Sequence, residues 1–330
     1  MMGFRLSFMG RRVMAAMMVV LLAGQVAAAE DHYPSRPITM IVPFPAGGST
    51  DVIARVIADA MRHVLEQPIL IENRGGAGGT IGTAAIAKAE PDGYTIGMGT
   101  ASTLAINPAA YKNLPYDIAK DLRPIGLIAS VPNVMTVNPS VRAKSIAELV
   151  ALAKMQPGKM TYGSAGNGSV SHLLGEQFKL ATHTNIVHVP YRGVGPALND
   201  AVAGQIFILF DNLPTSLPLI LDDKLRALAV SSPTRLEDLP DVPTFAELGL
   251  DEMNWMAFFG LVAPAKTRPS VIDRLNRALA QALATTQVGQ ILAKQHAFPQ
   301  PGPPSEFAAL IEREFTRMKR AVEAAGIEVQ

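Results

Sequence analysis

The sequence predicts an α/β protein made of two doubly wound units, the second inserted into the first. Strand-like and helix-like segments alternate along the 330-residue chain, an order typical of parallel sheets with helices on both faces. Hydrophobic residues make up 48% and charged residues 17% of the chain, which is enough apolar material for two cores and argues against disorder. Cysteine is absent, so disulfides and thiol chemistry are excluded.

The first unit contains three predicted strands, over 38–44, 68–74 and 94–100. Apolar residues at helical spacing follow the first strand over 52–65, and a helix rich in small residues is predicted over 80–89. This order of strands and helices predicts a parallel sheet. The chain ends in two predicted amphipathic helices, near 269–295 and 305–325.

The second unit begins after the chain crosses near 129–131. A helix is predicted from Ser145 to about Met155, with Ser145 and Glu148 forming a capping box. A strand, a glycine loop and a helix recur over 160–180, and short strands are predicted at 186–191, 207–212 and 225–232. The chain returns near 254–258, so we assign 30–130 and 255–330 to domain 1 and 131–254 to domain 2, with a ligand cleft between them. Two crossings of this kind allow closure about a hinge.

The first 29 residues are predicted to be a secretory signal peptide. Arg5, Arg11 and Arg12 precede a short apolar run, and small residues at Ala27–Ala29 predict cleavage after Ala29. The mature protein is therefore expected in the periplasm, and the sequence leaves open whether export uses the general or the twin-arginine pathway. The formal net charge of +1 and the lack of a basic run argue against a nucleic-acid partner.

Two loops rich in glycine and hydroxyl groups are candidate anion sites. In the first, Pro43 and Pro45 stiffen the path to Gly47 and Gly48, which leave the backbone open to approach, and Ser49 or Thr50 would cap the next helix. Helix N-termini favour negative charge, so we predict ligand contacts at Phe44, Ala46, Gly47, Gly48 and Ser49. The alternative is an ordinary tight turn, and Asp51 is best explained as an acid that stabilises the first helical turn.

The second loop, YGSAGNGSVSH over 162–172, also follows a strand and opens a helix. We predict ligand contacts at Ser164, Gly166, Asn167, Ser169 and His172, although such a histidine more often packs or is solvated. The segment ENRGGAGGT matches neither the dinucleotide nor the phosphate-loop pattern, so it is expected to be a turn that packs closely.

Three further residues are candidates for recognition. Tyr191 ends the strand predicted over 186–191, beside Arg192, whose guanidinium can hold a carboxylate. The alternative for Arg192 is an exposed position beside a glycine turn, which is the commoner case. Asp211 ends a predicted strand, where binding groups often lie. It would either receive a ligand amine or orient a loop, and the sequence does not decide between these roles.

Catalysis, a metal and a cofactor are not expected. The alternative function is an α/β hydrolase that uses Ser164 or Ser169 with His172 or His188, but no G-x-S-x-G elbow surrounds either serine. No H-E-x-x-H motif or carboxylate cluster indicates a metal. A structural or adhesin-like module would not need two loops rich in donors.

Several segments together resemble the Bug family, the periplasmic substrate-binding proteins of tripartite tricarboxylate transporters. They include IVPFPAGGSTDVIARVIADAM, ENRGGAGGTIGTAAIAKAEPDGYTIGMGT, YGSAGNGSVSHLLGEQFK, VPYRGVGPALNDAVAGQ, FDNLPTSLPLI and LRALAVSSPTRLEDLPDVPTFAELG. The resemblance runs from about Tyr33 to the C-terminus. It implies a two-lobed, type II-like periplasmic binding fold whose cleft holds a dicarboxylate, tricarboxylate, acidic amino acid or aromatic acid.

The resemblance also implies how the ligand is held. One carboxylate would be bound by both glycine loops, partly through water, and the ligand would also meet Thr100, Ala101 and Ser102 and the region of Asp211. Membrane permease subunits are the implied partners of an otherwise monomeric protein. One departure concerns MNWMAFFGL, where Trp255 lies earlier than in the family pattern and Phe258 and Phe259 take its place.

Overall fold

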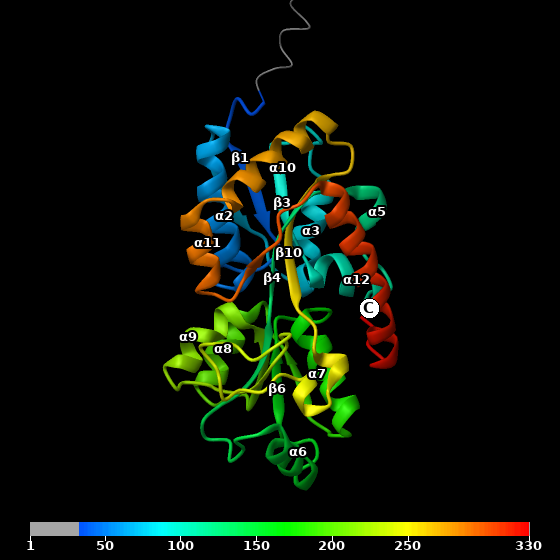
Figure 1. Cartoon of the computed structure of the whole chain (residues 1–330). Helices are drawn as coiled ribbons and strands as arrows, with labels where there is room; N and C mark the ends of the chain where they lie inside the picture. Colours follow the sequence, from blue (N-terminus) through cyan, green and yellow to red (C-terminus); the bar gives the residue numbers. More distant parts are fainter. Residues whose placement is uncertain (1–32, 330) are drawn as a thin grey trace, which may run out of the picture. The chain divides into compact units, whose positions relative to one another are not determined.

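Two β-sheets, each covered by helices on both faces, form the framework of the protein (Figure 1). The computed structural model describes residues 33–329, and all elements below lie in the compact unit that starts at Arg36. The predicted signal peptide lies outside the described residues. Within 33–329, no helix has the length and apolar character needed to cross a membrane.

The first sheet has the strand order β11-β4-β10-β3-β1-β2. Its strands are β1 (Ile38–Val42), β2 (Ile69–Asn73), β3 (Thr95–Thr100), β4 (Leu122–Val131), β10 (Ala257–Pro264) and β11 (Phe298–Pro299). As predicted, β1 pairs in parallel with β2 and β3. The sheet as a whole is mixed, because β10 inserts antiparallel between β3 and β4. Local alternation of elements cannot predict this pairing, since β10 joins from a distant part of the chain.

Helices cover both faces of this sheet. They are α2 (Ser49–Leu65), α3 (Thr80–Ala87), α4 (Asn107–Ala110), α5 (Ile118–Asp121), α10 (Pro269–Leu283), α11 (Thr286–Ala293) and α12 (Pro304–Ala324). Figure 1 shows α2, α10 and α11 on one side of the sheet and α3 and α12 on the other. The helix predicted over 269–295 is in fact two helices, because Thr285 accepts the N–H of Val288 and starts α11.

The second sheet has the order β7-β6-β8-β5-β9. Its strands are β5 (Asn133–Val137), β6 (Thr161–Ser164), β7 (Val187–Pro190), β8 (Ile208–Asn212) and β9 (Arg226–Val230). Its helices are α6 (Ile146–Met155), α7 (Val170–Thr182), α8 (Val194–Val202) and α9 (Leu213–Leu221). The predicted cap of α6 is present, since Ser145 accepts the N–H of Glu148 at 3.2 Å. Strand β6 is parallel to β7 and β8, and β5 is antiparallel to β8 and β9.

The chain passes between the sheets at two adjacent places. Strand β4 ends at Val131 and β5 begins at Asn133, so the first crossing is at Pro132. The return leads into β10, where Ala257 pairs with Val131. The side chain of Asn133 donates to the carbonyl of Trp255 at 2.7 Å, so a hydrogen bond joins the two crossings.

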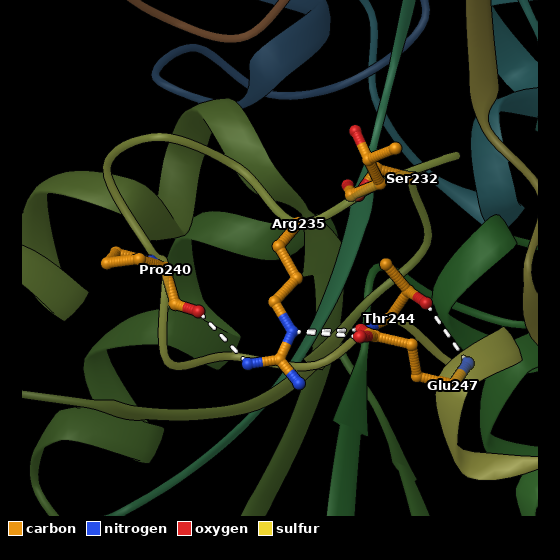
Figure 2. Close-up of polar contacts among 6 residues, drawn as sticks. Ser232, Arg235, Pro240, Thr244 and Glu247 are labelled. Carbon is orange, nitrogen blue, oxygen red and sulfur yellow. Dashed lines mark hydrogen bonds and ion pairs between the residues drawn. The ribbon is translucent and has the colours of Figure 1, made fainter.

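The long connection from β9 to β10 has little regular structure and is held by polar contacts (Figure 2). Arg235 donates from Nε to both carboxylate oxygens of Glu247 at 3.0 Å and from a terminal nitrogen to the carbonyl of Pro240 at 3.1 Å. Glu247 in turn accepts the N–H of Thr244 at 2.7 Å. These contacts satisfy backbone groups that no sheet partner reaches. Two short 3₁₀-helices, η4 (Ala246–Leu248) and η5 (Asp251–Met253), follow.

Strands of both sheets end where helices begin. β1 leads to α2, β3 leads to the π-helix η3 (Ser102–Ile106), β6 leads to α7 and β8 leads to α9. The 3₁₀-helix η2 (Ala77–Gly79) precedes α3. In open α/β sheets, the carboxyl ends of the strands are the usual place for a ligand, and the cavity of this protein lies there.

Candidate functional site

A cavity of about 40 Å³ lies at the carboxyl ends of strands from both sheets. Its lining consists of Phe44, Pro45, Gly48, Ser49, Thr50, Thr100, Ala101, Ser102, Ala165, Ser169, Val170, Ser171, Val194, Asp211, Asn212, Ala257, Phe258 and Phe259. These residues come from six strand or helix ends far apart in the sequence. Seven of the predicted contact residues are among them: Phe44, Gly48, Ser49, Thr100, Ala101, Ser169 and Asp211.

The first glycine loop contributes the start of α2. Gly48 is the N-cap residue and has no side chain with which to cap the helix, so no side chain of the N-cap satisfies the first-turn N–H groups. Ser49 and Thr50 of this first turn line the cavity. Gly47 has φ +85°, a left-handed conformation that disfavours any other residue. Gly47 and Ala46 are exposed and do not line the cavity.

Asp51 fixes this loop from the side away from the cavity. Its carboxylate accepts the N–H of Gly47 at 2.9 Å and donors from Arg55 and Asn73, both at 2.9 Å. Burial tends to raise the pKa of Asp51, but the hydrogen bonds from Arg55, Gly47 and Asn73 leave that pKa below its ordinary value. Asn73 also donates to the carbonyl of Phe44 at 3.0 Å. Asp51 therefore acts on the loop and the helix, in line with the sequence interpretation.

The end of β3 brings a second set of hydroxyl groups. Thr100 and Ser102 are buried at the cavity, and the backbone N–H of Thr100 donates to the hydroxyl of Thr103 at 3.1 Å. The hydroxyl of Ser102 accepts the N–H of Val170 at 3.0 Å. This hydrogen bond runs from the first turn of α7 to η3 of the other sheet.

Of the residues of the second glycine loop that line the cavity, only Ser169 is one of the predicted contact residues. Ala165, Ser169, Val170 and Ser171 face it, whereas Ser164, Gly166, Asn167 and His172 do not. Ser169 is the N-cap of α7, and its hydroxyl accepts the N–H of His172 at 3.3 Å while donating to the carbonyl of Gly166 at 2.6 Å.

The other predicted residues of the second loop do not line the cavity and form contacts elsewhere. Ser164 is fully buried, and its hydroxyl lies 2.6 Å from Nε2 of His188. Asn167 is exposed, and its carbonyl accepts a hydrogen bond from Tyr111 at 3.1 Å. Nδ1 of His172 accepts the N–H of Gly168 at 3.2 Å, so this nitrogen is directed at the loop backbone.

Tyr191 is half-buried and lies just before Gly193, the N-cap of α8. Its hydroxyl donates to Asp200 at 2.6 Å, and burial, with Asp200 beside it, raises the pKa of Tyr191 to about 12. Arg192 is exposed. Neither residue lines the cavity, whereas Val194 does, just after the N-cap Gly193.

Asp211 lies at the cavity and is nearly buried, with 4% of its surface exposed. One carboxylate oxygen accepts the N–H of Asn212 at 2.7 Å and the other accepts the hydroxyl of Ser216 at 2.8 Å. Burial raises the pKa of Asp211 to about 7, because desolvation outweighs these hydrogen bonds. Asp211 therefore orients the start of α9 through both carboxylate oxygens and is part of the cavity wall.

The apolar part of the wall comes from Phe44 and from the start of β10. Phe258 and Phe259 line the cavity, whereas Trp255 does not. The Trp255 ring lies elsewhere, with its N–H donating to Gln177 at 3.2 Å and the Arg317 guanidinium 5.9 Å from its centroid. The shift noticed in MNWMAFFGL thus places phenylalanines rather than tryptophan at the cavity.

Sequence reasoning missed part of the wall. The residues it did not select as contacts include Pro45, Thr50, Ala165, Val170, Ser171, Val194, Asn212 and Ala257. Val194 is the first residue of α8, shortly after β7, and Asn212 is the N-cap of α9 at the end of β8. The strand-to-helix signal is present in VPYRGV and FDNLP. Ala257 could not be found this way, because it reaches the cavity only through the antiparallel pairing of β10.

The electrostatic character of the cavity comes from backbone dipoles. The N-termini of α2, α7, α8 and α9 all contribute lining residues, and each carries partial positive charge. Among the described residues that line it, none is Lys, Arg or His. Hydroxyl and backbone donors therefore dominate, and the arrangement favours a small anion. Within residues 33–329, no group of three or more His, Asp or Glu side chains is placed to hold a metal ion.

Comparison with known proteins gives consistent relatives over nearly the whole chain. Protein BugT of Bordetella pertussis is 38% identical over 322 residues, which is 97% of this chain and 99% of BugT. The solved structure of periplasmic binding protein BugD is 34% identical with a TM-score of 0.87, and the match covers 90% of this chain and 100% of BugD.

Two further structures contain organic acids. Rpa4515 of R. palustris with adipate is 35% identical with a TM-score of 0.86, covering 90% of this chain and 99% of that protein. MatC from Rhodopseudomonas palustris with bound malate is 32% identical with a TM-score of 0.85, covering 88% of this chain and all of MatC (100%). The two sheets described above are thus the two lobes of a periplasmic binding fold, as the sequence predicted. Residues 53–327 match the model of the tripartite tricarboxylate transporter family receptor, and the chain belongs to this family.

Proposed function

We propose that this protein is a periplasmic solute-binding protein that captures a small organic acid as its carboxylate in the cavity between its two lobes. The observation that carries the proposal is the convergence of four helix N-termini on a cavity whose lining includes no cationic side chain. Adipate in Rpa4515 and malate in MatC are ligands of the matching chemistry in those proteins. Export with cleavage after Ala29 forms part of the proposal.

Energies explain why both loops are needed. Micromolar affinity corresponds to about 8 kcal/mol, whereas one helix terminus contributes roughly 0.3–2 kcal/mol. A hydrogen bond to a charged group adds roughly 1.5–3 kcal/mol. About four or five such bonds from the two loops, direct or through water, reach the required range.

Asp211 favours a particular class of acid. A carboxyl group in the cavity wall disfavours a second ligand carboxylate beside it, whereas a ligand ammonium group there would form a charge-assisted hydrogen bond. We therefore infer that an amino dicarboxylate is preferred over a plain dicarboxylate of the same length. The small cavity volume of about 40 Å³ also favours a compact acid over an aromatic one.

Binding is expected to close the two lobes around the ligand, with the protein remaining a monomer. The two adjacent crossings, at Pro132 and before Ala257, form a hinge of the kind that permits such closure. Small-angle scattering with and without a saturating acid tests both points. An unchanged radius of gyration at saturation contradicts closure, and a stable large oligomer contradicts the monomer.

The test of the ligand class uses succinate, L-malate and L-aspartate, which share one carbon skeleton and differ at C2. Thermal shift and calorimetry should show stabilisation by the acids and none by succinamide, which lacks carboxylates. Stabilisation by the diamide equal to that by succinate would overturn carboxylate recognition. L-Aspartate should bind the wild type at least about tenfold more tightly than succinate, the equivalent of about 1.4 kcal/mol.

Asp211→Asn tests the role of the carboxyl group separately. The amide keeps the shape of Asp211 but removes its charge, so the variant should lose its preference for L-aspartate while binding succinate as well as before or better. Equal loss for all three acids would assign Asp211 to the α9 cap alone and leave carboxylate capture intact.

The hydrolase alternative has one supporting distance, the 2.6 Å between Ser164 Oγ and His188 Nε2. The hydroxyl of Ser164 is fully buried and does not line the cavity, so a substrate in the cavity would not meet the nucleophile. The hydroxyl of Ser169 is directed at the carbonyl of Gly166. We therefore propose a binding protein without turnover. Ester and amide panels test this, and hydrolysis that disappears in Ser164→Ala would contradict it.

The family implies membrane permease subunits as partners. We propose delivery of the captured acid to such a permease, or a role in sensing. Loss of uptake of the bound acid after deletion of the gene would support transport. Intact uptake together with altered induction of acid-utilisation genes would support sensing.

A further inference from the structure

Three aromatic rings stack directly behind the second glycine loop, away from the cavity. The ring of His188 on β7 lies between Tyr162 on β6 and His172 on α7, with centroid distances of 4.9 Å and 4.2 Å. The planes of the two imidazoles differ by only 14°. None of the three rings lines the cavity, so the mechanism of ligand capture described above does not use them.

Both histidines form hydrogen bonds with the loop. Nε2 of His188 lies 2.6 Å from Ser164 Oγ, which also accepts the N–H of Gly166 at 3.1 Å. Nδ1 of His172 accepts the N–H of Gly168 at 3.2 Å. Gly166 and Gly168 have φ +116° and +75°, conformations that only glycine adopts easily. The histidines thus hold both ends of the sharpest part of the loop.

These contacts require a neutral imidazole at His172. Because Nδ1 accepts from a backbone N–H, the proton of His172 must lie on Nε2. A second proton on Nδ1 would face the N–H of Gly168 and break the contact. A charge on either ring would also lie against the neighbouring imidazole of the stack.

The surroundings keep the two rings neutral. Burial lowers the pKa of His172 and lowers that of His188 to about 3, with Lys179 acting in the same direction for both rings and His172 doing so for His188. Glu176 opposes this effect at His172, but its carboxylate is paired with Lys179 at 2.7 Å and accepts the Tyr162 hydroxyl at 2.6 Å. Tyr162, Glu176 and Lys179 are the titratable groups that surround the pair.

We propose that His172 and His188 are positioning residues, which hold the loop from Ser164 to Ser171 in its ligand-binding conformation as neutral hydrogen-bond partners. The loop places Ala165, Ser169, Val170 and Ser171 at the cavity wall, so its backbone path sets where these donors lie. The effect of this loop position on ligand capture rests on the proposed function. The positioning itself can be measured in the ligand-free protein. Acidification that protonates Nδ1 of His172 should release the loop at Gly168.

The test compares two substitutions of His172 in the ligand-free protein. Asparagine places an amide oxygen close to the position of Nδ1 and does not titrate, whereas leucine fills similar space without an acceptor. Amide hydrogen exchange of Gly168, read by NMR, should lose at least about tenfold protection in His172→Leu and stay within about threefold of wild type in His172→Asn. His63→Leu, at an exposed histidine of α2, is the matched control and should leave Gly168 unchanged.

The exchange protection of Gly168 as a function of pH distinguishes the hydrogen-bonding role from a packing role, because packing alone would not make this protection depend on the protonation of His172. Because the pKa of His172 is lowered by burial, protection of Gly168 in the wild type should persist at the ordinary histidine pKa of 6.5 and fall only at lower pH, and His172→Asn should remove or weaken that fall. If His172→Leu does not fold, His188→Leu tests the His188 contact, because it leaves the Ser164 hydroxyl in place and should still lower the protection of Gly166. Equal loss in His172→Asn and His172→Leu, or full protection in His172→Leu, would overturn the proposal.

Binding of L-malate, measured by calorimetry, separates this inference from the proposed function. Weaker malate binding in His172→Leu but not in His172→Asn links the loop to capture. If no variant and no wild-type protein binds any organic acid while the exchange pattern is as expected, the proposed function fails and the positioning role stands.

Discussion

The N–H of Val170 donates a hydrogen bond of 3.0 Å to the hydroxyl of Ser102, across the cavity from one lobe to the other. Val170 is the first residue of α7, so its N–H has no partner within the helix. The hydroxyl of Ser49 makes a second contact between the lobes, with Thr215 of α9. The lobes are therefore joined by hydroxyl groups at the cavity wall itself, and the first prediction below follows from this contact.

Ser102→Ala should weaken the closed arrangement of the lobes. A buried hydrogen bond contributes about 0.5–1.5 kcal/mol, so the dissociation constant for the preferred acid should rise by roughly twofold to tenfold. Calorimetry measures the effect, and Ser305→Ala, at an exposed position on α12, is the matched control. Equal affinity in Ser102→Ala and wild type would show that the contact does not support closure.

Gly78→Ala should block the approach of the lobes. A Cβ atom on Gly78 would lie 2.1 Å from the carbonyl oxygen of Asn167 in the second glycine loop, a distance at which the backbones must separate. We expect a loss of affinity of at least about tenfold and no ligand-induced change in the radius of gyration.

Gly326→Ala provides the control for Gly78→Ala. Gly78 has φ +60° and Gly326 has φ +63°, but a Cβ atom on Gly326 would meet nothing within 4 Å. Both variants are destabilised by about 1 kcal/mol because alanine must adopt a left-handed conformation. Only in Gly78→Ala does the new Cβ atom clash with the other lobe. Similar affinities for the two variants would contradict the steric explanation.

Asp211 should make stability fall as the pH rises. Its pKa is about 7 in the folded protein, against an ordinary value of 3.8, so between these values the folded state holds a proton that the unfolded chain has released. Stability therefore decreases with rising pH through this window and is flat above it. Asp211→Asn should flatten the profile and be more stable than wild type at about pH 8. Urea unfolding at a series of pH values measures the free energy of unfolding. Asp273→Asn, at an exposed position of α10, is the control.

Trp255 should report ligand binding by fluorescence, since it is the single tryptophan of the chain. Its indole N–H contacts Gln177 of α7 at 3.2 Å, and Arg317 of α12 lies 5.9 Å from its ring centroid, so groups from both lobes surround it. Closure should change the emission with the same dissociation constant that calorimetry gives. Gln177→Leu should shift the emission before any acid is added. Unchanged emission at saturation would mean that the lobes do not move at Trp255.

Much of the fold was predictable from local signals. The parallel arrangement of β1, β2 and β3 follows from alternating strands and helices, and the start of α6 follows from Ser145 and Glu148. The two glycine loops could be selected because Gly48 and Ser169 each lie where a strand has just ended and a helix begins. Such signals are short in range, because capping and turn chemistry involve residues a few positions apart.

The sequence by itself therefore determined the kind of site, a pair of donor-rich loops for an anion, and the class of fold that holds them. The tertiary structure alone decided which face of each loop meets the cavity. In the second loop, Ser169 and Ser171 line the cavity. Ser164 instead contacts His188, and His172 accepts the N–H of Gly168. The tertiary structure also brought Ala257 into the cavity wall and placed Trp255 away from it, in contact with Gln177. The physical reason is that these positions depend on the pairing of β10 with β3 and on contacts between the lobes, which join residues tens of positions apart and leave no local pattern.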